Sequence, residues 1–142
     1  MKTLFKLNTK KMYLSFILLI LIFAFWYPYI MKEDKKYIEN EILLINGTYK
    51  INIPLKEVSI ISLNENLPIL NRRENGLASF NIRKGYFIGD KKYYLNINKS
   101  NPQFIYIFRN EEIPVIINFK DSNETVLLYE KFKKEFNINT EN

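Results

Sequence analysis

The sequence predicts a mainly β (β+α) domain that ends in one helix and is preceded by one membrane-spanning helix. An uncharged run over residues 12–31 predicts the first helix, alternating apolar and polar residues over 43–120 predict strands, and a helical period after Asp121 predicts the last helix. The 111 residues that follow the run suit one small domain. The expected segments are a basic tail (1–11), a transmembrane helix (12–31), a connector (32–42), a β domain (43–137) and a disordered tail (138–142).

The uncharged run is long enough to cross a bilayer. Twenty helical residues at ~1.5 Å per residue reach ~30 Å, the thickness of the hydrocarbon core. The rest of the chain is too small to bury so apolar a helix, so we expect a membrane anchor. Trp26 and Tyr27 lie at its far end, where aromatic rings favour the headgroup level. The expected anchor side chains are Leu14, Phe16, Leu19, Leu21, Phe23, Trp26 and Tyr27.

Charges on the two flanks predict the orientation of this anchor. Four lysines and no acid precede the run, whereas Lys32, Lys35 and Lys36 are mixed with acids after it. Because lysine and arginine stay on the cytoplasmic side, we expect a single-pass protein of the cell membrane with a cytoplasmic N-terminus and an extracytoplasmic domain. Three alternatives stay open: a cleaved signal peptide, a buried helix of a soluble protein, and the reverse topology. The run is longer than a typical signal-peptide core and lacks a small-residue cleavage site.

Composition excludes several classes of function. The net charge is +6, but four of the 21 basic residues lie in the tail, which leaves 17 against 15 acids and argues against a nucleic-acid-binding domain. The chain has no Cys and no His, the residues of thiol chemistry and of most metal sites. Asp34, Asp90 and Asp121 fall in the connector, a turn and a cap. We therefore expect no enzyme, no catalytic residues, no cofactor and no metal.

Between the connector and the last helix we expect about six or seven short antiparallel strands. Val58 and Ile60 share one phase and Ile61 and Leu63 the other, which predicts a bulge or a bend. Turns are expected at 89–90, 99–102 and 110–112. Pro114 marks either the start of the last strand or a sheet edge. Among the aromatic residues we expect Tyr93, Phe104, Tyr106 and Phe119 in the core, and Phe87 and Tyr94 at the surface.

The last helix is amphipathic. Leu128, Phe132 and Phe136 recur at helical spacing and would cover the open end of a curled sheet. Asp121 or Ser122 can cap its N-terminus.

A long stretch over residues 63–84 has no clear period and carries a basic set that could hold an anion. The alternative is a solvated loop whose charges pair with Glu65 and Glu74. The candidate ligand or partner residues are Arg72, Arg73, Asn75, Phe80, Arg83 and Lys84.

Several short pieces, in this order, resemble the bacterial pleckstrin-homology-like (PH-like) family of small membrane-anchored domains. They are Arg73-x-Asn75-Gly76, Lys84-Gly85-Tyr86-Phe87, Asn101-Pro102-x-Phe104-Ile105, Asn118-Phe119-Lys120-Asp121 and Thr125-x-x-Leu128-Tyr129. The resemblance implies a curled antiparallel β-barrel of about seven strands capped by the C-terminal helix. Eukaryotic relatives often bind phosphoinositides through basic residues of the first hairpin. Here residues 53–57 carry one lysine beside an acid, so that activity is not carried over.

The resulting expectation is a non-enzymatic interaction module that binds another envelope protein or itself beside the membrane. The alternative is a binder of anionic lipid headgroups or of a cell-wall polyanion through the loop from Arg72 to Lys84.

Overall fold

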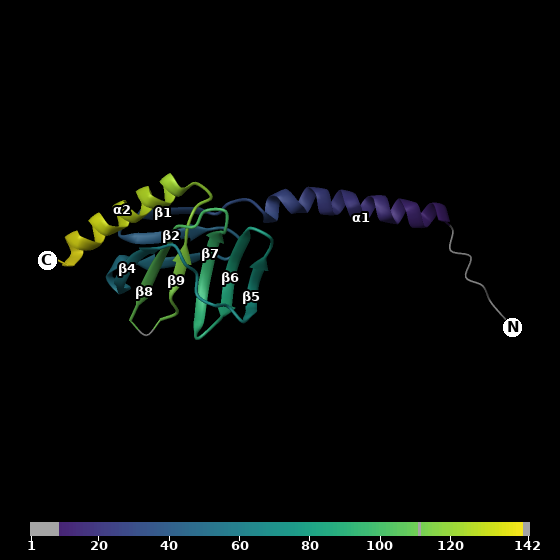
Figure 1. The fold of residues 1–142 in the computed structure, drawn as a ribbon. Coiled ribbons are helices and arrows are strands. Elements are labelled where there is room, and N and C mark those ends of the chain that lie inside the picture. The colour runs from purple at the N-terminus through teal and green to yellow at the C-terminus, as the bar shows by residue number, and fades with distance from the viewer. Residues whose placement is uncertain (1–8, 111, 141–142) are drawn as a thin grey trace. The chain divides into compact units, whose positions relative to one another are not determined.

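The computed structural model describes residues 9–110 and 112–140 (Figure 1). The chain divides into two compact units, one ending at Lys32 and one beginning at Glu33. Most of the expected basic tail, residues 1–8, lies outside the described residues.

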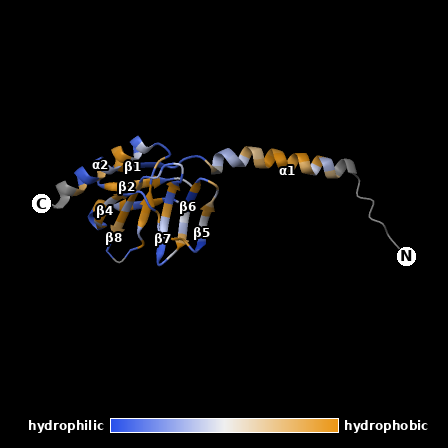
Figure 2. Ribbon diagram, in the orientation of Figure 1, coloured by the Kyte–Doolittle hydropathy of each residue, from blue (hydrophilic) through white to orange (hydrophobic). Residues whose placement is uncertain are grey.

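Helix α1 (Thr9–Ile30) lies in the first unit and is most hydrophobic in its middle (Figure 2). Residues Met12–Tyr29 are long and apolar enough to cross a membrane, and none of them is buried by the rest of the described chain. Pro28 lies in the last turn of the helix. There it removes one backbone donor without breaking the helix. The predicted long apolar helix is confirmed.

The second unit contains nine strands in two sheets. The three-stranded sheet has the order β1-β2-β3, and the six-stranded sheet has the order β4-β8-β9-β7-β6-β5. The strands are β1 (Lys35–Glu39), β2 (Ile42–Asn46), β3 (Ile51–Pro54), β4 (Val58–Asn64), β5 (Arg72–Ala78), β6 (Ile82–Ile88), β7 (Lys92–Asn98), β8 (Phe104–Arg109) and β9 (Val115–Ile117). A short 3-10 helix, η1 (Leu55–Glu57), links the two sheets, and helix α2 (Ser122–Thr140) follows the last strand.

The expected closed, wholly antiparallel barrel is wrong. Strand β9 lies between β7 and β8 and runs parallel to β7. The six-stranded sheet therefore ends at β4 and β5, and the three-stranded sheet ends at β1 and β3, without closure. Because β9 is central, Pro114 marks the start of a strand and not an edge.

The expected connector is also wrong, because residues 35–39 form β1 and pair with β2. Asn40 and Glu41 make the tight turn between them with φ values of 50° and 59°. Asparagine tolerates this left-handed conformation, but Asn-Glu lacks the glycine that usually predicts such a turn.

The inner face of the six-stranded sheet packs on the three-stranded sheet and on α2. Leu128 and Phe132 are buried in this core and Phe136 packs against it, as predicted. The Asp121 carboxylate accepts a hydrogen bond from the backbone N–H of Asn123 (2.8 Å) and so caps α2. The helix continues to Thr140, three residues into the disordered tail expected over 138–142, and residues 141–142 lie outside the described residues.

Part of the outer face of the six-stranded sheet is covered as well, by the loop over residues 65–71. Leu67 and Leu70 of this loop pack on a second core that contains Phe87, and the Tyr106 hydroxyl donates to the Asn66 carbonyl (2.6 Å). Phe87 and Tyr94 were expected at the surface, but they are 3% and 1% exposed because both faces of the sheet are covered there. The predicted irregularity in β4 is confirmed, since its register shifts between Val58 and Ile60.

Candidate functional site

A buried ion pair joins the first residues of the domain to the six-stranded sheet. The Asp34 carboxylate binds the Lys84 ammonium of β6 through Oδ1 (2.6 Å) and the Asn96 amide of β7 through Oδ2 (2.6 Å). The three residues are only 6%, 2% and 2% exposed. Lys84 and Asn96 lie opposite each other in the sheet register, so both reach Asp34 from the inner face. This arrangement fixes the chain immediately after α1 into the body of the domain.

Gly47 makes room for the Asp34 carboxylate. A Cβ atom at this position would lie 2.0 Å from the Asp34 Cγ, well inside van der Waals contact. A side chain at residue 47 therefore requires the carboxylate to leave its place beside Lys84 and Asn96.

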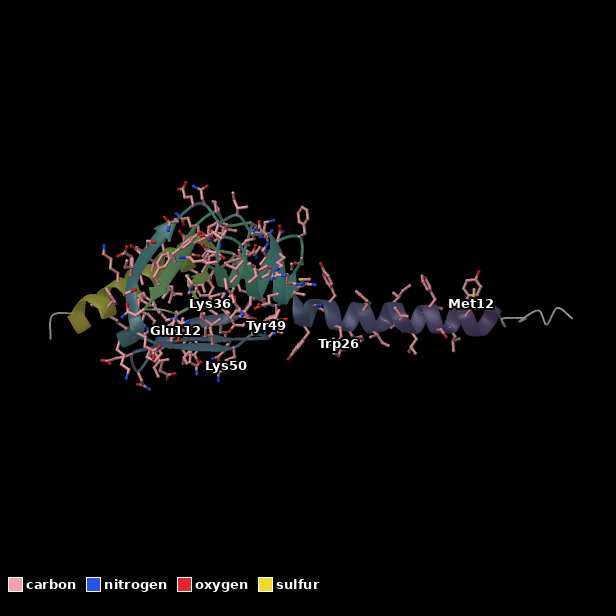
Figure 3. The ribbon with its side chains drawn as sticks, turned by 90° about the horizontal axis from the view of Figure 1, so that it is seen from below. Met12, Trp26, Lys36, Tyr49, Lys50 and Glu112 are labelled. Atoms are coloured by element: carbon pink, nitrogen blue, oxygen red, sulfur yellow. The ribbon has the colours of Figure 1, made fainter. Side chains whose placement is uncertain are left out.

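Lys36, which is labelled in Figure 3, is a second buried lysine that contacts Asp34. Its ammonium donates to the Asp34 carbonyl (3.2 Å) and lies over the Phe119 ring, 4.6 Å from the centroid. Burial lowers the pKa of Lys36 to about 8, although the nearby Glu33 and Asp34 charges raise it. Lys36 also lines a groove of about 280 Å³ between β1 and α2, together with Leu127 and Lys131.

The lowered pKa of Lys36 predicts that stability rises with pH between about 8 and 10. In this window the unfolded chain keeps the Lys36 proton and the folded chain loses it, so the unfolded state binds more protons and deprotonation favours folding, by at most about 3 kcal/mol. Above pH 10 the stability should fall again as the pH rises. Burial and the hydrogen bond to Asp90 raise the pKa of Tyr93 to about 12, so the folded chain keeps a Tyr93 proton that the unfolded chain loses.

Lys36→Met tests this prediction, because methionine keeps much of the side-chain volume over Phe119 without the charge. Thermal unfolding of the full chain in detergent should show a Tm that climbs from pH 8 to 10 in the wild type and stays flat in the variant. At pH 7 the variant should be at least as stable as the wild type. An equal slope for both chains would contradict the assignment.

A set of buried amides holds the start of α2 against the sheet. The Asn101 side chain donates to the Phe119 carbonyl and to the Thr125 hydroxyl (both 3.0 Å). The Asn118 side chain donates to the carbonyls of Asn98 and Asn101 (both 3.0 Å). All of these bonds are internal, so this network holds the turn between β7 and β8 in place and needs no ligand.

The basic set predicted over residues 72–84 lies mostly on the β5–β6 hairpin but does not converge. Arg83 and Lys84 are neighbours on β6 and so project from opposite faces, as do Arg72 and Arg73 on β5. Lys84 is buried against Asp34, so it cannot contact a ligand at the surface.

The other members of the set remain near the surface. Arg72, Arg73 and Asn75 are exposed on β5, Arg83 is half-buried, and Phe80 is 91% exposed in the hairpin turn. Glu74, one of the two acids expected to pair with these arginines, binds Lys92 instead.

Within residues 9–110 and 112–140, no group of three or more His, Cys, Asp or Glu side chains is placed to hold a metal ion. No protein-family model, curated protein or solved structure matches the chain. The resemblance to the PH-like family therefore stays a prediction.

Proposed function

We propose that this chain is a single-pass membrane protein whose β domain is a non-enzymatic interaction module on the outer side of a cell membrane. The observation that carries the proposal is the apolar stretch Met12–Tyr29 of α1, which the described chain leaves unburied. Side chains of this kind are stable in lipid and costly in water.

The buried Asp34 supports a role beside the membrane. Only Met31, Lys32 and Glu33 separate the end of α1 from this anchored residue. Four residue steps span at most about 14 Å in any arrangement. A domain on such a short link meets partners that are membrane neighbours, and confinement to one surface raises its effective concentration toward them.

The alternative ligand, an anionic headgroup or polymer, has less support. An anion site built on the β5–β6 hairpin needs converging cations, and here they divide between two faces with Lys84 occupied by Asp34. We therefore infer that the domain binds a protein.

Sidedness is tested by single cysteines, because the chain has no native Cys. A membrane-impermeant maleimide should label Glu130→Cys, exposed on α2, in intact cells, and should label Lys10→Cys only after permeabilisation. Labelling of residue 10 but not of residue 130 in intact cells would reverse the topology.

The interaction itself is tested by amine-reactive cross-linking on the same cells. We expect adducts that contain the chain and exceed its own mass of 17.1 kDa. A chain that stays at its own mass while a known membrane complex is cross-linked in parallel would contradict an interaction module.

A further inference from the structure

Strand β4 leaves one edge of the six-stranded sheet unpaired. It pairs with β8 along its length, at the end of the sheet opposite β5 (Figure 1). In the described part of the chain, the Val58 N–H donates to the Leu55 carbonyl of η1, and no backbone hydrogen bond from residues 59–64 reaches any element other than β8. The backbone groups on the far side of β4 are thus available to another strand.

The sequence of β4 is unusual for an exposed edge. Its seven residues, VSIISLN, contain no charge and no proline. Ile60 is 59% exposed on the outer face, while Ile61 and Leu63 pack against the inner core. Uncharged strands rich in β-branched residues pair readily with other strands.

The other three edges carry features that oppose strand pairing. Strand β5 begins with three charged residues and has a register shift after Arg73, and β3 has four residues and ends at Pro54. Strand β1 carries charges at both ends. The Lys131 ammonium also donates a hydrogen bond to its Ile38 carbonyl (2.9 Å). In β4 the irregularity lies at its start, which leaves Ile60–Asn64 in regular register. Of these four edge strands, only β4 has neither a charge nor a proline.

We propose that the free edge of β4 pairs antiparallel with β4 of a second copy of this chain, joining two six-stranded sheets. A two-fold axis perpendicular to the sheet keeps inner and outer faces aligned, so the row of Ile61 and Leu63 continues across the junction. Two copies of an uncharged strand meet without like-charge repulsion. A foreign partner would be selected by charges, and the seven residues of β4 carry none.

This inference rests on the membrane anchoring proposed above. Two paired strands of seven residues bury much less than the roughly 1,200–2,000 Å² of a stable complex. Confinement in one bilayer supplies the missing effective concentration. Pairing should therefore increase as the ratio of protein to lipid rises and should be weak in dilute detergent.

Single-cysteine cross-linking of the full chain in liposomes tests the pairing. Three outer-face positions of β4 are changed one at a time, Ile60→Cys, Ser62→Cys and Asn64→Cys, and the control is Ile69→Cys, which is 86% exposed in the loop over 65–71. Under mild oxidation, at least one β4 position should form disulfide dimers several-fold faster than residue 69. Equal rates at all four positions would mean random collision and would overturn the proposal.

A variant that introduces a charge into β4 gives the second measurement. Ile60→Lys places like charges near each other across the two-fold axis and should abolish energy transfer between labelled chains, whereas Ile69→Lys should leave it unchanged. Equal transfer in both variants would also overturn the pairing. If the chains insert in the liposomes but show no pairing at β4, this inference fails alone; if they do not insert, the proposed function fails.

Discussion

Lys84→Met is expected to lower the stability of the domain by about 3–5 kcal/mol, because it leaves the Asp34 carboxylate buried without its cation. Asn96 would still donate to this carboxylate, but one neutral amide does not offset the loss of a charge partner in a site that is almost closed to water. For a small domain this corresponds to a fall in Tm of more than about 10 °C. Near-UV circular dichroism of the full chain in detergent, followed during heating, measures it.

The surface ion pair between Lys92 and Glu74 provides a matched control. Its two side chains are 37% and 42% exposed, so Lys92→Met should cost less than about 1 kcal/mol. The double variant Asp34→Asn/Lys84→Met removes both buried charges, and it should recover much of the stability lost in Lys84→Met alone. Equal, small effects of Lys84→Met and Lys92→Met would show that the buried pair contributes nothing special.

Features encoded by local patterns could be predicted from the sequence. The apolar run of α1, the spacing of Leu128 and Phe132 in α2, and the phase change in β4 each depend on near neighbours in the chain. The insertion of β9 between β7 and β8 could not be predicted in this way. Its three residues are buried on both faces, so they show no alternation and carry no information about the strands on either side.

The buried ion pair was missed because each partner lies in a charged cluster. Asp34 follows Lys32 and Glu33, and Lys84 follows Arg83, so both resemble solvent-exposed segments. The sequence did hold one signal, the alternation of buried and exposed side chains along a strand. Asp34 and Lys36 share the phase of the buried Ile38, which is the pattern of β1. The partners are 50 residues apart, so no local pattern could have paired them.

Charges placed in the middle of α1 are expected to release the chain from membranes. Each arginine at a helix centre costs about 2.5–3.5 kcal/mol for insertion, so Leu19→Arg together with Leu21→Arg opposes the gain from the remaining apolar residues. The control is Leu127→Arg, the same kind of substitution at a position of α2 that is 69% exposed. Fractionation of cells should find the double variant largely outside the membrane pellet and the control within it.

The anchor itself is tested most directly by extracting native membranes with alkaline carbonate. We predict that the intact chain of 17.1 kDa stays in the pellet and dissolves only in detergent. Release of the intact chain into the carbonate supernatant, or recovery of a soluble chain cut after α1, would contradict a membrane-anchored protein.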